Sequence, residues 1–160
     1  MSIDNSALGF KLTQRIEGIK RSMNRVTYEA VAAMVIRFDE VSPVADAMLW
    51  ARPDPKYVGG QFRGNWQLGV NQQPTGWLPG KIDPTGVETV SENIAKIPAA
   101  ASRGHKYYLV NNTPYGRYLE DGSVVMKVYP MHFVLRAKRE FNQVVRNIAA
   151  EIKSEGGRVT

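Results

Sequence analysis

The chain has 160 residues, of which 43% are hydrophobic, so it is long enough to fold as one ordinary domain around its own core. Its longest uninterrupted apolar run, Ala30 to Ile36, falls far short of the about 20 residues that a membrane-spanning helix needs. We therefore expect no such helix, and the N-terminus lacks the pattern of a secretory signal. The absence of cysteine excludes disulfides, thiolate zinc sites and cysteine nucleophiles.

The net charge of +6 is unevenly distributed along the chain. Residues 101–160 carry ten Lys or Arg residues and five acidic residues, so this stretch supplies most of the excess. Such a bias permits contact with nucleic acid or with an acidic protein surface, and it is equally compatible with a solvated basic face.

A long N-terminal helix is predicted within residues 1–40. Its apolar residues recur in steps of four and three, the seam of helices that pack side by side: Leu12, Ile16, Ile19, Met23, Val26, Ala30 and Ala33. The second half is apolar on more faces, which indicates burial. The first half either lies on the same core or extends to a neighbouring subunit. In the second case, removal of residues 1–24 is expected to abolish assembly and to leave a folded core.

The rest of the chain predicts short elements separated by turns. A helical turn is expected over Val44–Trp50, and a strand over Trp66–Val70 with one buried face. A helix follows Asp83-Pro84, where Thr85 and Glu88 can form a capping box, and it ends before Pro98. Two further strands and a closing amphipathic helix are expected at 106–110, 123–129 and 133–152.

This order predicts an α+β fold in which residues 1–160 form a single structural domain. A small, mainly antiparallel sheet of three or four strands packs with the long N-terminal helix, a middle helix and the C-terminal amphipathic helix. The sheet edges must be covered by other elements or paired with another subunit. The alternation around Trp66 predicts that its side chain packs against Tyr115 or the last helix.

No catalytic, cofactor-binding or metal site is predicted. The two histidines, His105 and His132, fall on different elements without metal-ligand spacing, and each is expected to cap an element or face solvent. The glycine-rich segment Gly59–Gly64 matches neither a phosphate-binding loop nor a dinucleotide-binding loop. We therefore expect that the protein is not an enzyme.

Two short blocks combine aromatic, glycine and charged residues: 59–66 and 107–122. In the second block Glu120 is predicted to be buried, and a buried carboxylate needs a partner, for which Arg63 or Arg117 is available. On physical grounds alone the second block is explained by a well-packed strand–turn–strand unit.

The blocks also carry a family resemblance. The segment Gly60-x-Phe-Arg-Gly-Asn-Trp66 resembles the start of the first strand in the neck and tail-completion proteins of long-tailed bacteriophages, a family that includes minor tail and tail-component proteins. The segment Asn111-x-x-x-Tyr115-Gly-x-x-Leu119-Glu120-x-Gly122 is similar to the signature of that family. The segment Pro130-Met-His-Phe133, followed by Arg136-Ala137, is similar to the start of its last helix.

The resemblance implies a virion structural protein at the head–tail junction, present in the host cytoplasm during assembly and then in the neck or tail. It implies a homo-oligomeric ring that contacts the connector or head-completion protein on one side and the tail terminator or tail tube on the other. Non-specific contact with passing DNA is compatible with it, and no membrane is involved. The residues it marks as motif or interface positions are Arg63, Trp66, Asn111, Tyr115, Glu120 and Gly122. Alternatives are a tail-terminator ring protein and a small basic nucleic-acid-binding protein.

Overall fold

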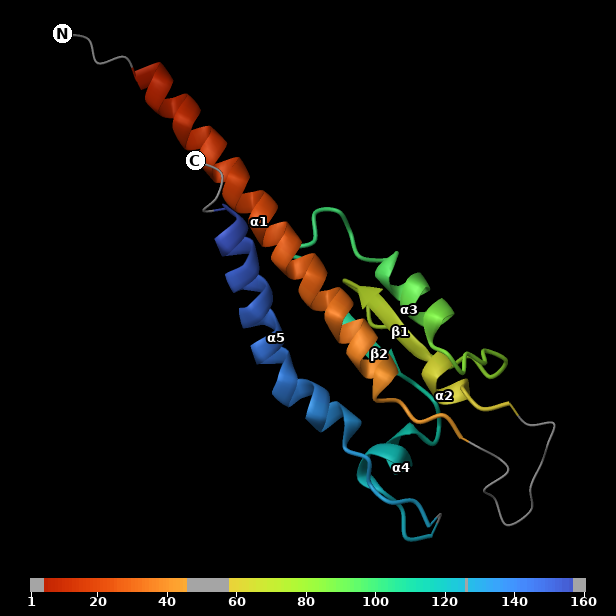
Figure 1. The fold of residues 1–160 in the computed structure, drawn as a ribbon. Helices are drawn as coiled ribbons and strands as arrows, with labels where there is room; N and C mark the ends of the chain where they lie inside the picture. The colour runs from red at the N-terminus through yellow and green to blue at the C-terminus, as the bar shows by residue number, and fades with distance from the viewer. Residues whose placement is uncertain (1–4, 46–57, 126, 157–160) are drawn as a thin grey trace.

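The computed structural model describes residues 5–45, 58–125 and 127–156. Its longest element is helix α1, Asn5–Glu40, and helix α5, Phe133–Gly156, runs antiparallel along one side of it (Figure 1). A bidentate ion pair joins Arg37 to Glu140, with Nε–Oε2 and Nη2–Oε1 distances of 2.6 and 3.0 Å. A second pair joins Arg25 to Glu155 near the end of α5. These contacts fix the register of the two helices. None of the helices in the described ranges combines the length and apolar character that crossing a bilayer requires.

The sheet has two strands and lies with helix α3, Val87–Ile94, on another side of α1 (Figure 1). Strand β1, Trp66–Val70, pairs antiparallel with strand β2, Tyr107–Asn111, and Leu68 lies opposite Leu109. Two short helices complete the described elements: α2, Gln61–Gly64, before β1, and α4, Gly116–Asp121, after β2. The small α+β fold with its long first helix, middle helix and C-terminal helix is confirmed.

The strand predicted over 123–129 is wrong. Ser123 and Val128 instead exchange two backbone hydrogen bonds of 2.9 Å with each other, so the segment folds back on itself. Lys127 has a φ of 52°, which breaks any extended run. As a result Val124 and Val125 are 96% and 91% exposed, and within the described ranges the sheet has two strands where three or four were expected.

The predicted capping box at the start of α3 is also wrong in its residues. The carboxylate of Asp83 accepts hydrogen bonds from the backbone N–H groups of Gly86 and Thr89, both at 2.8 Å. Thr85 donates its hydroxyl to the same carboxylate at 3.0 Å. The chain reaches this geometry because Gly86 adopts a φ of 77°, a conformation that favours glycine. The expected helical turn over Val44–Trp50 lies largely outside the described residues, and Val44 and Ala45 are not helical.

Two apolar cores lie side by side along neighbouring faces of α1. The first, which we call the aromatic core, consists of Phe38, Phe62, Trp66, Phe133 and Ala137. The second consists of Val35, Leu68, Ile97 and Ala101. Trp66 and Leu68 are two residues apart in β1 and therefore point to the same face of the sheet. This single strand face supplies one side chain to each core, so β1 joins the packing of α5 to that of α3.

Replacement of Trp66 by Ala is expected to lower the free energy of unfolding by about 3–5 kcal/mol, because a large buried side chain is lost and a cavity remains. Chemical denaturation followed by circular dichroism measures the change. Tyr118→Ala is the control, because that aromatic ring on α4 is 47% exposed, and its loss is expected to cost far less. A Trp66→Ala variant as stable as the original would contradict the placement of this residue in the core.

Candidate functional site

Of the six motif residues marked by the resemblance, Trp66 lies in the aromatic core and Tyr115 packs against it. In that core the rings of Phe38 and Phe62 lie 4.8 and 5.9 Å from the ring of Trp66, measured between centroids, and the ring of Phe133 lies at 6.1 Å. Trp66 therefore packs against the last helix, as its place in the strand predicted. The indole Nε1–H donates to the hydroxyl of Ser42 at 2.6 Å, and that hydroxyl donates to the Phe38 carbonyl at 2.6 Å. The buried indole is thus satisfied and the end of α1 is fixed to β1.

Asn111 and Tyr115 attach the end of β2 to α2. The Asn111 amide donates to the Phe62 carbonyl at 2.7 Å, and its oxygen accepts the Thr113 hydroxyl at 2.9 Å. The Tyr115 hydroxyl lies 3.3 Å from Oε1 of Gln61, and its ring lies 6.2 Å from that of Phe62. Both side chains are engaged within the chain. They support the turn between β2 and α4.

Glu120 and Gly122 shape the start of α5. The carboxylate of Glu120 accepts the backbone N–H groups of Val134 and Leu135 at 2.9 and 3.2 Å. The predicted pairing with Arg63 or Arg117 is wrong, because these free donors at the first turn of α5 take up the carboxylate instead. Gly122 has a φ of 79°, and a Cβ there would lie 2.9 Å from Cδ of Pro130, so the close approach of the chain favours glycine.

Arg63 belongs to a buried polar group on the other side of α2. Its guanidinium donates to the carbonyls of Pro84 and Ser42 at 2.7 and 3.1 Å, and its Nε lies 3.7 Å from the carboxylate of Asp39. Asp39 is only 6% exposed, and its Oδ1 atom has no hydrogen-bond partner within the described structure. Burial raises the pKa of Asp39 to about 6; the nearby Arg63 acts in the opposite direction, whereas the carboxylates of Asp83 and Glu40 add to the rise.

Asp83 is also buried, but its pKa moves the other way. Burial alone acts to raise the pKa of Asp83, and the hydrogen bonds that its carboxylate accepts from Thr89, Thr85 and Gly86 together lower it. The backbone of Gly86 comes so close to Asp39 that a side chain at that position would overlap the Asp39 carboxylate. Asp39 and Asp83 therefore lie at the same turn, but their pKa values shift in opposite directions.

Two asparagines that the sequence did not single out complete this framework. The Asn93 amide donates to the Trp66 carbonyl and its oxygen accepts the Leu68 N–H, both at 2.8 Å. Asn93 of α3 thus provides hydrogen-bond partners for backbone groups at the free edge of β1. The sequence predicts that another element covers such an edge or that a partner subunit pairs with it. Asn65, fully buried, bonds both the carbonyl and the N–H of Leu78 at 3.0 and 2.6 Å. A lone Asn carries no periodicity, so periodicity marks neither residue, although Asn65 stands inside the block at 60–66.

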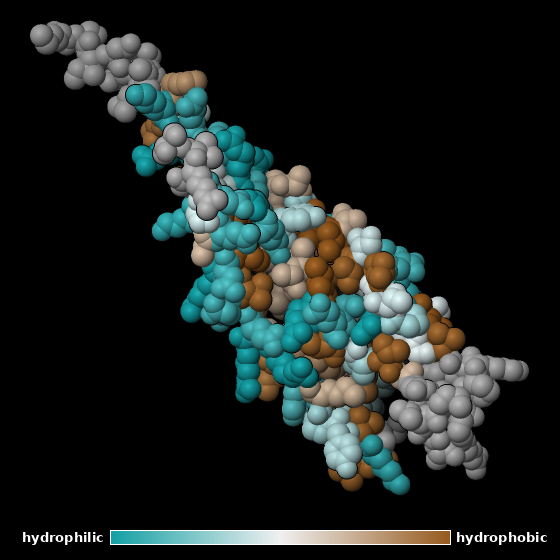
Figure 2. All heavy atoms as spheres, in the orientation of Figure 1, coloured by the Kyte–Doolittle hydropathy of each residue, from teal (hydrophilic) through white to brown (hydrophobic). Residues whose placement is uncertain are grey.

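The motif residues are consequently scaffold, and the exposed apolar surfaces lie elsewhere. The first is on the N-terminal half of α1, which extends past the end of α5 (Figure 1). We call this half the arm, and we call its exposed apolar stripe, Leu12, Ile16, Ile19 and Met23, the arm seam. The second, which we call the tip, consists of residues 123–125 and 127–130 beside α4, where Val124, Val125 and Tyr129 are exposed. Figure 2 shows hydrophobic patches interleaved with hydrophilic residues over the long helices.

No group of three or more His, Asp or Glu side chains in the described parts of the chain could hold a metal ion. His105 lies 2.9 Å from the amide nitrogen of Asn71 through its Nδ1 atom, and His132 is exposed at the start of α5. A scan against models of known protein families finds no match, and searches of curated proteins and of solved structures also return no significant similarity.

Replacing Asp39 by Asn is expected to flatten the dependence of stability on pH. The folded state binds the Asp39 proton more tightly than the unfolded chain, whose Asp pKa is near 3.9, so the contribution of Asp39 falls as pH rises from about 4 through about 6. Between pH 4.5 and 7.5 the original protein should lose about 2 kcal/mol that Asp39→Asn does not lose. Urea denaturation at each pH measures this difference, and Asp121→Asn, at an exposed carboxylate, is the control. Parallel pH profiles for Asp39→Asn and the original protein would contradict the assignment.

Truncation of Glu120 to Ala is expected to cost about 1 kcal/mol, because the first turn of α5 loses the acceptor of two backbone N–H groups. Thermal denaturation followed by circular dichroism at 222 nm measures it. Glu151→Ala, on the exposed face of the same helix, should change the free energy of unfolding by less than about 0.5 kcal/mol. Equal effects of the two variants would show that Glu120 does not cap α5.

Proposed function

We propose that this chain is a virion structural protein at the head–tail junction of a tailed bacteriophage, where it forms part of a neck or tail-completion ring that joins the connector to the tail. The proposal rests on the resemblance of the three blocks at 60–66, 111–122 and 130–137, taken in this order. Its work is mechanical: the subunit offers surfaces to neighbours, and the proposal includes no catalytic step.

The observation that carries the proposal furthest is the separation of the two exposed apolar surfaces. The arm seam lies toward one end of an elongated subunit, and the tip beside α4 lies toward the other (Figure 1). Exposed apolar clusters of this kind mark contact surfaces between proteins. A ring that joins the connector to the tail needs one surface for contacts between its own subunits and a separate surface for a different protein. A subunit with separate patches at its ends suits such an arrangement.

The motif residues fit this function as scaffold. Trp66, Asn111, Tyr115 and Glu120 fix the positions of β1, β2, α4 and the start of α5 relative to one another. The tip follows directly after α4, so its position depends on that framework. A rigid framework that holds a contact surface in place is what a closed ring needs, because every subunit must repeat the same angle.

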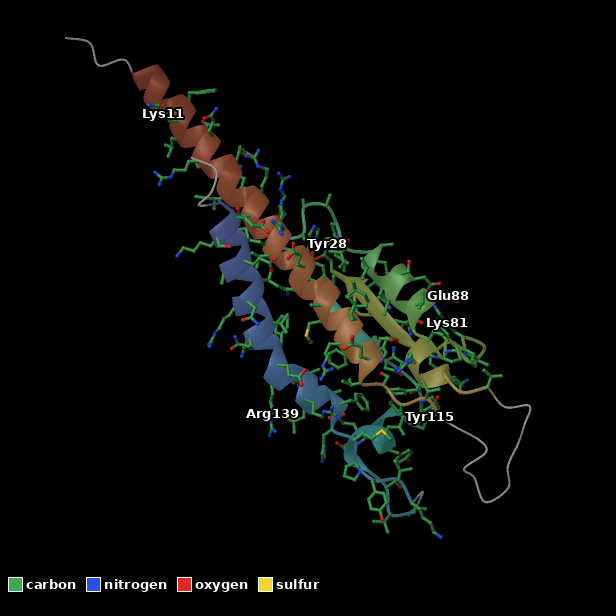
Figure 3. All side chains as sticks on the ribbon, in the orientation of Figure 1. Lys11, Tyr28, Lys81, Glu88, Tyr115 and Arg139 are labelled. Carbon is green, nitrogen blue, oxygen red and sulfur yellow. The ribbon has the colours of Figure 1, made fainter. Side chains whose placement is uncertain are left out.

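Nucleic-acid binding by a monomer is a second candidate function, favoured by the basic residues on the exposed surface of both long helices. Lys11 lies on the arm and Arg139 points away from α1 on α5 (Figure 3). Tight DNA binding by a monomer that weakens steeply with salt would support this candidate over the ring.

The purified full chain is expected to assemble into closed rings visible by negative-stain microscopy, with a matching multiple of the 17.9 kDa subunit mass by mass photometry. The double variant Val124→Asp and Val125→Asp should shift the protein toward the monomer, because it places charges in an apolar contact. Val87→Asp, an exposed valine on α3, is the matched control and should leave assembly unchanged. A protein that stays monomeric at all concentrations, alone and with virion neck components, would contradict the proposal.

A further inference from the structure

The arm seam is a continuation of the surface that α5 covers. Farther along α1, the same heptad positions are Val26, Ala30 and Ala33, which are buried or half-buried. The last turns of α5 reach only to this point, where Ala149 and Ile152 line a groove together with Ile19 and Met23. The described part of α5 ends at Gly156, and the seam continues beyond it on exposed residues (Figure 1). The last turns of α5 border Ile19 and Met23, and no other described helix lies against Ile16 and Leu12, so the helix-packing surface of α1 continues past the end of α5.

The spacing of the seam specifies a helix as the missing element. Leu12, Ile16, Ile19 and Met23 alternate steps of four and three, the pattern of knobs-into-holes packing between helices at a small angle. The stripe is about 17 Å long at 1.5 Å per residue. Phe10, although exposed, lies roughly 150° around the helix from this stripe and is not part of it.

The charges beside the seam indicate the sign of the charge that the partner's flanking residues carry. Arg15 lies on one flank and Lys20 on the other, both exposed, and Lys20 also pairs with Glu17 at 2.7 Å. From Phe10 to Met23 the arm carries four basic residues and one acidic residue: Lys11, Arg15, Glu17, Lys20 and Arg21. Flanking residues of packed helices face each other and select partners of opposite charge. Two arms would bring Arg15 and Lys20 of the two copies together, so pairing between arms is disfavoured.

The described elements of this chain offer no suitable occupant in a second copy. The exposed face of α5 is itself basic, with Lys138, Arg139, Arg146 and Lys153. Helix α3 carries the exposed acids Glu88 and Glu92, but it has only eight residues, and Val90 and Ile94 pack in the second core. Its exposed face therefore lacks an apolar stripe of the length of the arm seam.

From the continuity with the α1–α5 interface, the heptad spacing and the basic flanks, we infer that the arm seam binds an amphipathic helix with acidic flanking residues that belongs to a different protein. This helix extends the line of α5 along α1. The inference goes beyond ring formation and does not depend on it, because it concerns a contact with a different chain.

The test uses the full-length protein and two synthetic helical peptides of about three heptads with Leu at the seam positions. One peptide has Glu at the flanking positions and the other has Lys, and like charges keep each peptide monomeric. Fluorescence anisotropy of labelled peptide should show that the acidic peptide binds about tenfold more tightly than the basic one. The variant Arg15→Glu with Lys20→Glu should reverse this preference.

The variant Ile16→Ser with Ile19→Ser should lose binding of the acidic peptide, whereas Phe10→Ser, on the opposite side of the arm, should keep it. All five substituted residues, including Arg15 and Lys20, are exposed, and circular dichroism checks that the fold is retained. Equal binding of both peptides, or binding of neither, would overturn the inference. So would sedimentation showing that the protein self-associates through Ile16 and Ile19, or seam-dependent binding to anionic lipid vesicles without peptide binding. Ring assembly is measured without any peptide, so failure of the ring proposal and failure of this inference are distinguishable.

Discussion

The structure depends on how α1 is covered. One helix of 36 residues supplies Phe38 to the aromatic core, Val35 to the second core and Arg37 to the ion pair with α5. All these contacts fall on its C-terminal half, because α5, α3 and the two strands together are too short to cover the whole helix. Burial of apolar area is the main favourable term in folding, so the covered half of α1 carries most of its contribution to stability. The division of the molecule into a packed body and a projecting arm follows from this.

Within the packed body, side chains form many of the hydrogen bonds to backbone groups that regular secondary structure forms in larger domains. A two-stranded sheet is marginal by itself and leaves backbone groups at its edges without partners. Asn93 supplies both a donor and an acceptor to one edge of β1, and Glu120 and Asp83 receive the free N–H groups at the starts of α5 and α3. Buried polar groups with complete hydrogen bonds also restrict the core to one arrangement. Asp39, Arg63 and Thr89 are the exceptions, since each keeps one buried side-chain atom without a hydrogen-bond partner in the described structure.

Periodicity was sufficient to predict the helices α1, α3 and α5 and the strands β1 and β2, because repeated burial of one face leaves a pattern in the sequence; it did not predict the short helices α2 and α4. It also predicted that Trp66 packs against Tyr115 or the last helix, and its ring packs against Phe133 at the start of the last helix. It failed at 123–129, where Val124 and Val125 have strand propensity but a local turn leaves them in solvent. It could not assign partners to Glu120 or identify Asn93, because both depend on which distant backbone groups the fold leaves free. The resemblance singled out six residues as motif or interface positions. In the structure the side chains of five of them are engaged within the chain, the sixth, Gly122, shapes the turn before Pro130, and the exposed apolar surfaces lie on other segments.

The arm loses its helical structure on warming in a different way from the packed body. Every residue from Gly9 to Glu17 is exposed, and Gly18, near the middle of the arm, lowers helix propensity by about 1 kcal/mol relative to Ala. A helical segment of this length is marginal when only its own backbone bonds support it. Its helical content therefore declines gradually on warming, whereas the packed body unfolds in one cooperative step at higher temperature. The length of α1 that remains helical therefore depends on temperature as well as on sequence.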